Sequence, residues 1–159
     1  MKRILPLKDL YKNMLLIRYF EEGVLKLFEQ GKLFGTTHAY IGQEANAVGV
    51  ISCLQETDIV VSNHRCHGHY IMHRKNPYSL LCEMMGKEDG LCSGRGGSQH
   101  ICDDGFFTNG VQGGILPLSA GLAFSDDMRL FVHTIYRPEI YWVSLYGDVS
   151  ETSPESDSD

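Results

Sequence analysis

The chain has 159 residues, of which 43% are hydrophobic and 21% are charged, and its formal net charge is −6. This length suits a single hydrophobic core, and a negative charge without any basic stripe argues against a nucleic-acid-binding protein. No apolar run approaches the roughly 18 residues that a membrane-spanning helix needs, so we expect no membrane partner.

The five cysteines are scattered and form no C-x-x-C pair. This odd number is more typical of a reducing compartment than of a disulfide framework. The basic N-terminus is followed neither by an apolar signal core nor by a transit-peptide pattern. We therefore expect a cytoplasmic protein.

Hydrophobic residues at three-, four- and seven-residue steps predict a long helix over residues 9–30. A second, mostly buried helix is predicted over residues 45–54. A β-branched run over residues 58–62 predicts a strand. A third helix is predicted over residues 78–85, directly after an Asn-Pro pair.

Pro117 suits the first turn of a fourth helix that reaches about residue 124. A further strand is predicted over residues 140–146. Helices that alternate with short strands predict an α/β fold, with a parallel sheet and flanking helices. We expect one partial domain over residues 1–148. The acidic residues 149–159 have almost nothing to bury, and we expect them to form a disordered tail.

Two glycine-rich stretches, residues 94–100 and 109–117, lie between predicted elements. Glycine at this density weakens helices and strands, so folding stability alone gives little reason for it. It allows the backbone to approach a ligand closely and leaves main-chain N–H groups to bind an anion. A pair of tight turns is the alternative interpretation.

Three polar clusters are candidates for chemistry. The loop over residues 35–45 contains His38, and histidine is the side chain best suited to proton transfer near neutral pH. The segment after the first strand contains Arg65, whose guanidinium fork matches phosphate, and His64, which can donate another hydrogen bond. Asp148 ends the last predicted strand, where a carboxylate is a natural Mg²⁺ ligand.

The second of these clusters also allows a weaker alternative, a zinc-binding module. Its candidate ligands are His64, Cys66, His67 and His69, which His100 and Cys102 could join. Their spacing matches no familiar zinc module. Anion binding is therefore the better interpretation.

Taken in chain order, the clusters resemble the α subunit of the thiamine-diphosphate-dependent 2-oxo acid dehydrogenases, which include pyruvate, branched-chain and acetoin dehydrogenases. Together the matching pieces are highly specific, and in the expected order they span most of the first 124 residues. They are residues 18–22, 38–45, 64–68, 94–100 and 109–118. The resemblance implies an incomplete thiamine-diphosphate-binding fold that is truncated after the Gly-Asp turn.

The resemblance also implies roles for individual residues. His38 falls where the family has its catalytic histidine, beside the thiazolium ring. His64 and Arg65 fall where the family contacts the diphosphate. Gly110 and Gln112 fall where backbone groups hold the aminopyrimidine.

In the same way, Gly147 and Asp148 fall in the cofactor's metal-binding turn, where Asp148 would coordinate Mg²⁺. The family's Gly-Asp-Gly pattern is changed here, because Val149 replaces its second glycine. A β-branched side chain at this place predicts weak cofactor affinity for the chain alone.

The resemblance implies an oxidoreductase that decarboxylates a 2-oxo acid such as pyruvate, or cleaves acetoin, and passes the acyl group to a lipoyl carrier. It implies thiamine diphosphate and Mg²⁺ as cofactors. The implied partners are a β subunit, in a heterotetramer, and a lipoyl-bearing acyltransferase. The alternative is a non-catalytic interaction subunit of such a complex.

Overall fold

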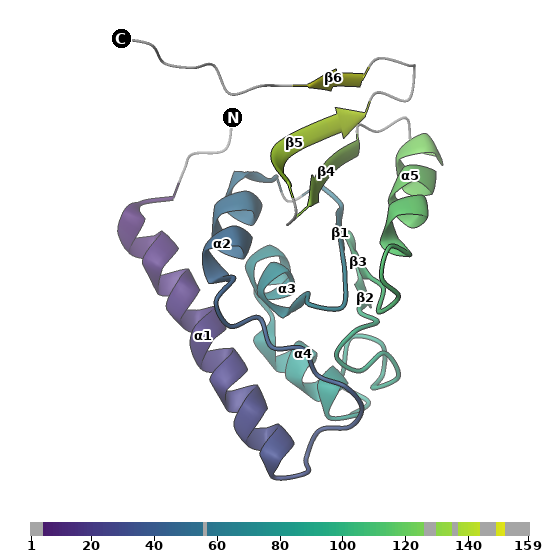
Figure 1. Ribbon diagram of the computed structural model, residues 1–159. Coiled ribbons are helices and arrows are strands. Elements are labelled where there is room, and N and C mark those ends of the chain that lie inside the picture. Colours follow the sequence, from purple (N-terminus) through teal and green to yellow (C-terminus); the bar gives the residue numbers. More distant parts are fainter. Residues whose placement is uncertain (1–4, 56, 126–129, 135–136, 144–148, 152–159) are drawn as a thin grey trace. The chain divides into compact units, whose positions relative to one another are not determined.

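The computed structural model describes residues 5–55, 57–125, 130–134, 137–143 and 149–151. The chain divides into two compact units, Met1–Ile115 and Leu116–Asp159, where the sequence predicted one domain over residues 1–148. No helix within the described ranges combines the length and the apolar character that a membrane span requires. Figure 1 labels the helices and strands of both units.

The first unit is α/β and contains four helices and three short strands within its described residues. In chain order these are α1 (Leu7–Glu29), α2 (Glu44–Cys53), β1 (Val60–Ser62), α3 (His67–Arg74), α4 (Pro77–Met84), β2 (Cys102–Asp103) and β3 (Phe106–Thr108). The predictions for α1, α2, β1 and α4 are confirmed within two residues. In Figure 1, α2 lies beside both α1 and α3.

The sheet of this unit is mixed rather than parallel, which corrects the sequence prediction. Its strand order is β1-β3-β2, with β1 parallel to β3 and β2 antiparallel to β3. The antiparallel pair arises because β2 and β3 are joined by a two-residue turn that contains Gly105, whose φ is +68°. Neither strand shows a clear alternation in the sequence, since each has at most three residues.

The second unit contains the predicted fourth helix, here α5 (Ile115–Ser125), which begins in the last residue of the first unit. Three antiparallel strands follow, β4 (Leu130–Thr134), β5 (Arg137–Val143) and β6 (Val149–Glu151), in the order β4-β5-β6. The strand expected over residues 140–146 corresponds to β5, which begins three residues earlier; residues 144–146 lie outside the described ranges. The segment predicted as a tail begins with β6, and its remaining residues lie outside the described ranges.

Helix α3 was not predicted, because residues 63–69 have the composition of a polar turn. Histidine and glycine are weak helix formers, so the sequence carries no local signal for this helix. Tertiary packing stabilises the helix instead, because α3 buries several of its residues. These are His67, Gly68, Tyr70, Ile71 and Met72. An alanine methyl at Gly68 would lie 2.5 Å from the Tyr40 ring, so glycine is required for this close packing.

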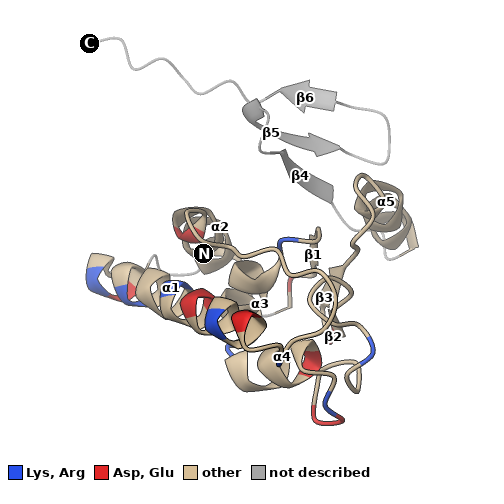
Figure 2. Cartoon of the chain, turned by 60° about the horizontal axis from the view of Figure 1, so that its bottom comes forward, with Lys and Arg blue, Asp and Glu red and all other residues tan. Residues whose placement is uncertain are grey.

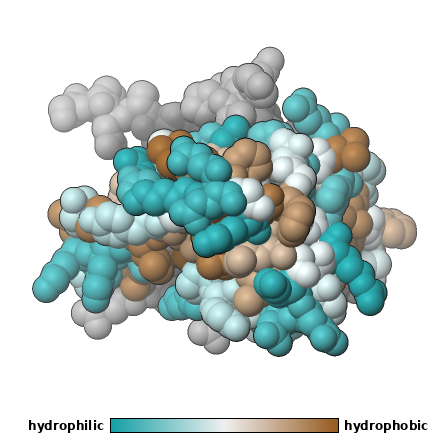
Figure 3. All heavy atoms as spheres, turned by 90° about the horizontal axis from the view of Figure 1, so that it is seen from below, coloured by the Kyte–Doolittle hydropathy of each residue, from teal (hydrophilic) through white to brown (hydrophobic). Residues whose placement is uncertain are grey.

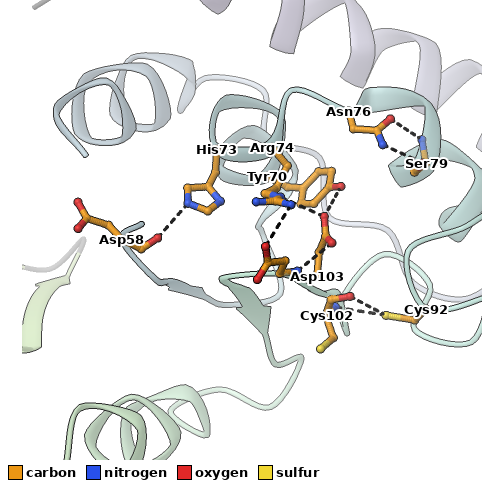
Figure 4. A network of polar contacts seen from close by, with 10 residues as sticks. Asp58, Tyr70, His73, Arg74, Asn76, Ser79, Cys92, Cys102 and Asp103 are labelled. Atoms are coloured by element: carbon orange, nitrogen blue, oxygen red, sulfur yellow. Dashed lines mark hydrogen bonds and ion pairs between the residues drawn. The ribbon is translucent and has the colours of Figure 1, made fainter. Parts of the chain in front are cut away.

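Polar contacts fix α3 against the sheet (Figure 4). The hydroxyl of Tyr70 donates to a carboxylate oxygen of Asp103 over 3.0 Å, and Arg74 Nε donates to the same oxygen over 3.3 Å. His73 Nε2 donates to the carbonyl of Asp58 over 3.1 Å. The aromatic rings of Tyr70 and Phe106 meet edge to face at 5.2 Å. These contacts hold α3, and the residues that precede it, in one position relative to β1.

Helix α1 buries only a narrow stripe, formed by Ile17, Glu21 and Val24. Basic and acidic residues alternate with uncharged ones along it, as the blue and red segments of Figure 2 show. Large apolar side chains are exposed on it as well, including Tyr11 at 60% and Tyr19 at 66%. The face of the molecule drawn in Figure 3 likewise mixes hydrophilic and hydrophobic residues.

An ion pair joins α1 to the start of α2. Arg18 Nε donates to Glu44 Oε1 over 2.7 Å, and the backbone N–H of Gly42 donates to the same carboxylate. Burial acts to raise the pKa of Glu44, but the hydrogen bonds from Arg18 and from backbone N–H groups outweigh it and hold this pKa below its usual 4.5.

We predict that this ion pair makes the stability of the first unit depend on pH. Because the folded state favours ionised Glu44, the contribution is complete above pH 4.5 and is lost as the pH falls through the lowered pKa. Because the Arg18 side chain is 40% exposed, Glu44→Gln should cost only about 1 kcal/mol at pH 7. The cost should be smaller at pH 3, below the usual pKa of Glu44. Urea unfolding at both pH values measures this difference. Glu29→Gln, at the exposed end of α1, is the control, and an equal loss at both pH values would contradict the prediction.

Candidate functional site

Three of the predicted site residues converge where β1 ends. The rings of His38 and His64 meet edge to face, with their centroids 4.7 Å apart. The guanidinium of Arg65 donates through Nη1 to the carbonyl of Ala39, the residue after His38. The loop that contains His38 is therefore held against the turn that follows β1, although 26 residues separate Ala39 from Arg65.

The turn after β1 has a local cause. The side-chain oxygen of Asn63 accepts the backbone N–H of Arg65 over 2.9 Å, which closes an Asx turn. Helix α3 begins only two residues later, at His67. His64 and Arg65 thus lie in a tight connection between a strand and a helix. Ligands commonly bind at this place in α/β folds.

In this connection, the electrostatics favour a neutral His64 beside the permanently charged Arg65. Burial, assisted by the neighbouring His38 and by the Arg65 guanidinium, holds the pKa of His64 below its usual 6.5. Arg65 stays charged at any physiological pH and has five N–H donors, of which one is used on Ala39. The arrangement can offer several hydrogen-bond donors to an anion while carrying only one full positive charge.

Sequence reasoning assigned no role to Gln99, which the structure places beside His38. Its amide nitrogen lies 3.1 Å from the carbonyl oxygen of Thr36 and 3.3 Å from Nδ1 of His38. The only signal for it was its position inside the glycine-rich stretch. No periodicity could mark this contact, because it joins residues that are 61 positions apart.

The first glycine-rich stretch binds an anion, but the anion is a side chain of the same protein. The carboxylate of Glu83, at the end of α4, accepts the backbone N–H groups of Cys92, Gly94, Gly96 and Gly97 at 2.6, 2.9, 2.6 and 3.2 Å. Glu83 is fully buried. The expectation that these N–H groups are left for a ligand is therefore wrong.

The glycines of this stretch are required by close contact within the loop itself. A Cβ at Gly96 would lie 1.9 Å from the carbonyl oxygen of His100, and a Cβ at Gly94 would lie 2.5 Å from the backbone of Gly86. Gly94 also has a φ of +74°, which side chains other than glycine rarely adopt. These contacts explain Gly94 and Gly96, two of the three glycines of the stretch, without any ligand.

A second buried chain of polar groups connects this loop to two helices. His67 Nδ1 lies 2.8 Å from Glu21 Oε1 of α1, and His67 Nε2 lies 2.9 Å from the hydroxyl of Ser98. Glu21 and His67 are both 0% exposed and Ser98 is 4% exposed. The chain resembles a Ser-His-acid triad in its order, but its complete burial gives it a structural role. It fixes Ser98, and with it the neighbouring Gln99.

The zinc interpretation fails because its candidate ligands have different partners. Cys66 donates to the carbonyl of Ser98, whereas His69 lies between the hydroxyls of Tyr40 and Ser62, each at 2.8 Å. Burial also raises the pKa of the Cys66 thiol to about 12, as is typical of an unreactive structural cysteine. Among the residues whose side chains are described, no group of three or more His, Cys, Asp or Glu could hold a metal ion.

The second glycine-rich stretch begins beside the same site. A Cβ at Gly110 would lie 2.5 Å from Oε1 of Gln99, so this backbone approaches the amide that contacts His38. Gln112 is exposed in the following turn, and no hydrogen bond of the described residues joins it to His38, His64 or Arg65. Gly147 and Asp148 lie outside the described residues, so the predicted metal ligand stays a prediction.

Comparison with known proteins identifies the group to which these features correspond. Residues 11–152 match the family model of the dehydrogenase E1 component. The chain is 44% identical over 123 residues to the α subunit of acetoin:2,6-dichlorophenolindophenol oxidoreductase from Bacillus subtilis, which covers 76% of this chain and 37% of that protein.

The α subunits of two pyruvate dehydrogenase E1 components are similar as well. The protein from Zymomonas mobilis is 41% identical over 127 residues, which covers 77% of this chain and 36% of that protein. The mitochondrial protein from Chaetomium thermophilum is 38% identical over 121 residues, with 76% and 29% covered. The matched region thus spans about a third of the length of these relatives.

We predict that Glu83 is the main support of the glycine-rich loop. Glu83→Gln should lower the free energy of unfolding by about 2–4 kcal/mol, because an amide presents N–H groups to buried N–H donors that then lose their acceptor. Glu88→Gln, in the exposed turn after α4, is the matched control and should change stability by less than about 0.5 kcal/mol. Urea unfolding followed by far-UV circular dichroism measures both. Equal stability of the two variants would refute the assignment.

We also predict that His64 titrates below pH 6.5 in the folded chain. Arg65→Gln should raise the pKa of His64 only part of the way towards 6.5, because burial lowers this pKa more than the Arg65 charge does. Imidazole resonances followed by NMR across pH 4–9 give this value directly. A titration midpoint of His64 at or above 6.5 in the unaltered chain would contradict the electrostatic interpretation.

Proposed function

Because this chain belongs to the dehydrogenase E1 component family, we propose that it serves as an α subunit of a thiamine-diphosphate-dependent dehydrogenase. The observation that carries the proposal is the convergence of His38, His64 and Arg65 at the end of β1. The same three residues lie in stretches that resemble the family's cofactor site.

The residues at this place suit a diphosphate. Arg65 can give bidentate hydrogen bonds to phosphate oxygens, and a half-buried His64 can add another donor. The close approach of Gly110 to Gln99 leaves bare backbone next to the site, where a substituted residue would not fit. These features support a cofactor held by Arg65 and His64 from one side and by the backbone near Gly110 and Gln112 from another.

Thiamine diphosphate, when bound, supplies the electron sink that allows the bond beside a ketone carbonyl to break. The residues of this chain would orient it and move protons, with His38 as the catalytic group beside the reacting atoms. We propose that Gly147 and Asp148 form the metal-binding turn and that Asp148 holds Mg²⁺. The proposed substrates are a 2-oxo acid such as pyruvate, or acetoin, and the proposed acyl acceptor is a lipoyl carrier.

The proposed assembly is a heterotetramer with a β subunit, which would complete the site, together with a lipoyl-bearing acyltransferase. The exposed apolar side chains of α1, such as Tyr11 and Tyr19, support contact with another subunit. A cytoplasmic location stays a prediction from the cysteine content.

A non-catalytic interaction subunit is the alternative, and one residue favours it. Val149 replaces the second glycine of the family's Gly-Asp-Gly pattern. A branched side chain there hinders the close approach of backbone to the metal and diphosphate. Such a subunit would purify together with a β subunit without binding the cofactor.

We predict that Arg65→Ala weakens cofactor binding by about ten- to a hundredfold, which corresponds to the loss of one charge-assisted hydrogen-bond pair. The measurement is titration calorimetry of thiamine diphosphate, with Mg²⁺, into the chain reconstituted with an acetoin or pyruvate dehydrogenase β subunit. Dye reduction with pyruvate or acetoin tests turnover in the same samples.

Lys26→Ala, on the exposed side of α1, removes a cation elsewhere and should leave the affinity unchanged. Identical heats for the unaltered chain and Arg65→Ala would remove the proposed diphosphate site. Stable association with the β subunit but no heat of binding would establish the non-catalytic alternative.

A further inference from the structure

We infer that Gln99 is a positioning residue that fixes the tautomer of His38, with the proton on Nε2 and the lone pair on Nδ1. The inference rests on the proposed function, in which His38 handles the proton. It is carried by a hydrogen-bond pattern that allows only one orientation of the amide. Neither the sequence nor the family resemblance assigned Gln99 this role.

The orientation of the Gln99 amide follows from Thr36. A backbone carbonyl oxygen only accepts hydrogen bonds, so the group that lies 3.1 Å from it must be the amide nitrogen. This nitrogen carries two hydrogens. The second is available to His38 Nδ1, which lies 3.3 Å from the same nitrogen. Turning the amide over would place two oxygens against each other at Thr36.

The tautomer of His38 follows from the orientation of Gln99. An atom that accepts a hydrogen bond from an amide must present its lone pair, so Nδ1 of the neutral ring is unprotonated. The other tautomer would set the N–H of His38 against the N–H of Gln99. The neutral ring therefore carries its hydrogen on Nε2. This is the atom through which His38 would exchange a proton at the reacting centre.

The main chain around Gln99 is held on both sides, which fixes the point from which its side chain extends towards His38. The preceding residue, Ser98, is bonded through its hydroxyl to buried His67. The carbonyl of Gln99 accepts the hydroxyl of Thr108 of β3 over 2.7 Å. Gly110 leaves the space that the amide oxygen occupies. The backbone of Gln99 is therefore already ordered when its side chain contacts His38, which suits a positioning residue.

The test is the ¹⁵N chemical shift of the two ring nitrogens of His38, measured on the 159-residue chain at a pH where the imidazole is neutral. Loss of one pair of signals in His38→Ala assigns the ring. In the unaltered chain we expect Nδ1 to show the shift of an unprotonated nitrogen and Nε2 that of a protonated one. A proton found on Nδ1 would overturn the inference at once.

Two variants sharpen this measurement. Gln99→Met removes the donor at nearly constant volume, so the two nitrogen shifts should move towards each other as the second tautomer becomes populated. Gln99→Glu replaces the donor with an acceptor and should move the proton towards Nδ1. Gln30→Met, after the end of α1, is the matched control and should leave both shifts in place. The other histidine signals report whether each variant folds, and unchanged His38 shifts in folded Gln99→Met and Gln99→Glu would refute the role.

Turnover distinguishes failure of this inference from failure of the proposed function. In the heteromer reconstituted with a β subunit, Gln99→Met should lower kcat by about tenfold, with little change in KM, because a misdirected proton impairs the reaction rather than binding. A heteromer that binds no cofactor would remove the proposed function and leave the tautomer result intact. Unaltered kcat together with altered nitrogen shifts would show that the tautomer has no catalytic consequence and would overturn the positioning role.

Discussion

The described site depends on the hydrogen bonds that the buried carboxylate of Glu83 accepts from the glycine-rich loop. A charge that is 0% exposed is costly unless hydrogen bonds replace its water, and four backbone N–H groups do so here. Those groups belong to a loop with no regular secondary structure, whose N–H groups would otherwise lack acceptors. The carboxylate and the loop thus satisfy each other. The loop then carries Ser98 and Gln99 to fixed positions, so a residue at the end of α4 determines the geometry around His38.

In the first unit, a series of polar contacts runs from the buried core to His38 and His64, and its members become more exposed along the way. Glu21, His67 and Ser98 are buried and connect α1, α3 and the glycine-rich loop. Gln99 is the next step outward and contacts His38, which in turn meets His64. The side chains of Glu21, His67 and Ser98 each have a hydrogen-bond partner, although the second carboxylate oxygen of Glu21 has none among the described residues. These contacts position the glycine-rich loop, which has almost no apolar side chains that could pack in the core.

The sequence predicted the elements that depend on local hydrophobic pattern. It did not predict the features that depend on tertiary contacts. The long helix α1 and the helix α4 follow from apolar periodicity and from the Asn76-Pro77 start, and both are confirmed. Helix α3 has no such pattern, since packing against Tyr40 and the sheet makes it helical. The nearness of His38 and His64 came from a family resemblance rather than from spacing. The roles of Gln99 and Glu83 depend on contacts between residues far apart in the chain, which no local pattern contains.

The glycine-rich loop shows that contacts within the chain can explain a glycine motif beside a proposed site. Glycines at 94 and 96 are explained by atoms of the same loop and of Gly86, and their N–H groups are already occupied. Such a loop can be as strictly constrained as a binding residue, because one added methyl group would displace its backbone and with it Gln99. His64 and Arg65, which we propose as the diphosphate contacts, lie in the short connection between β1 and α3 and not in this loop. Within the described part of the chain, the glycine motif and the proposed binding residues are therefore neighbouring but separate structures.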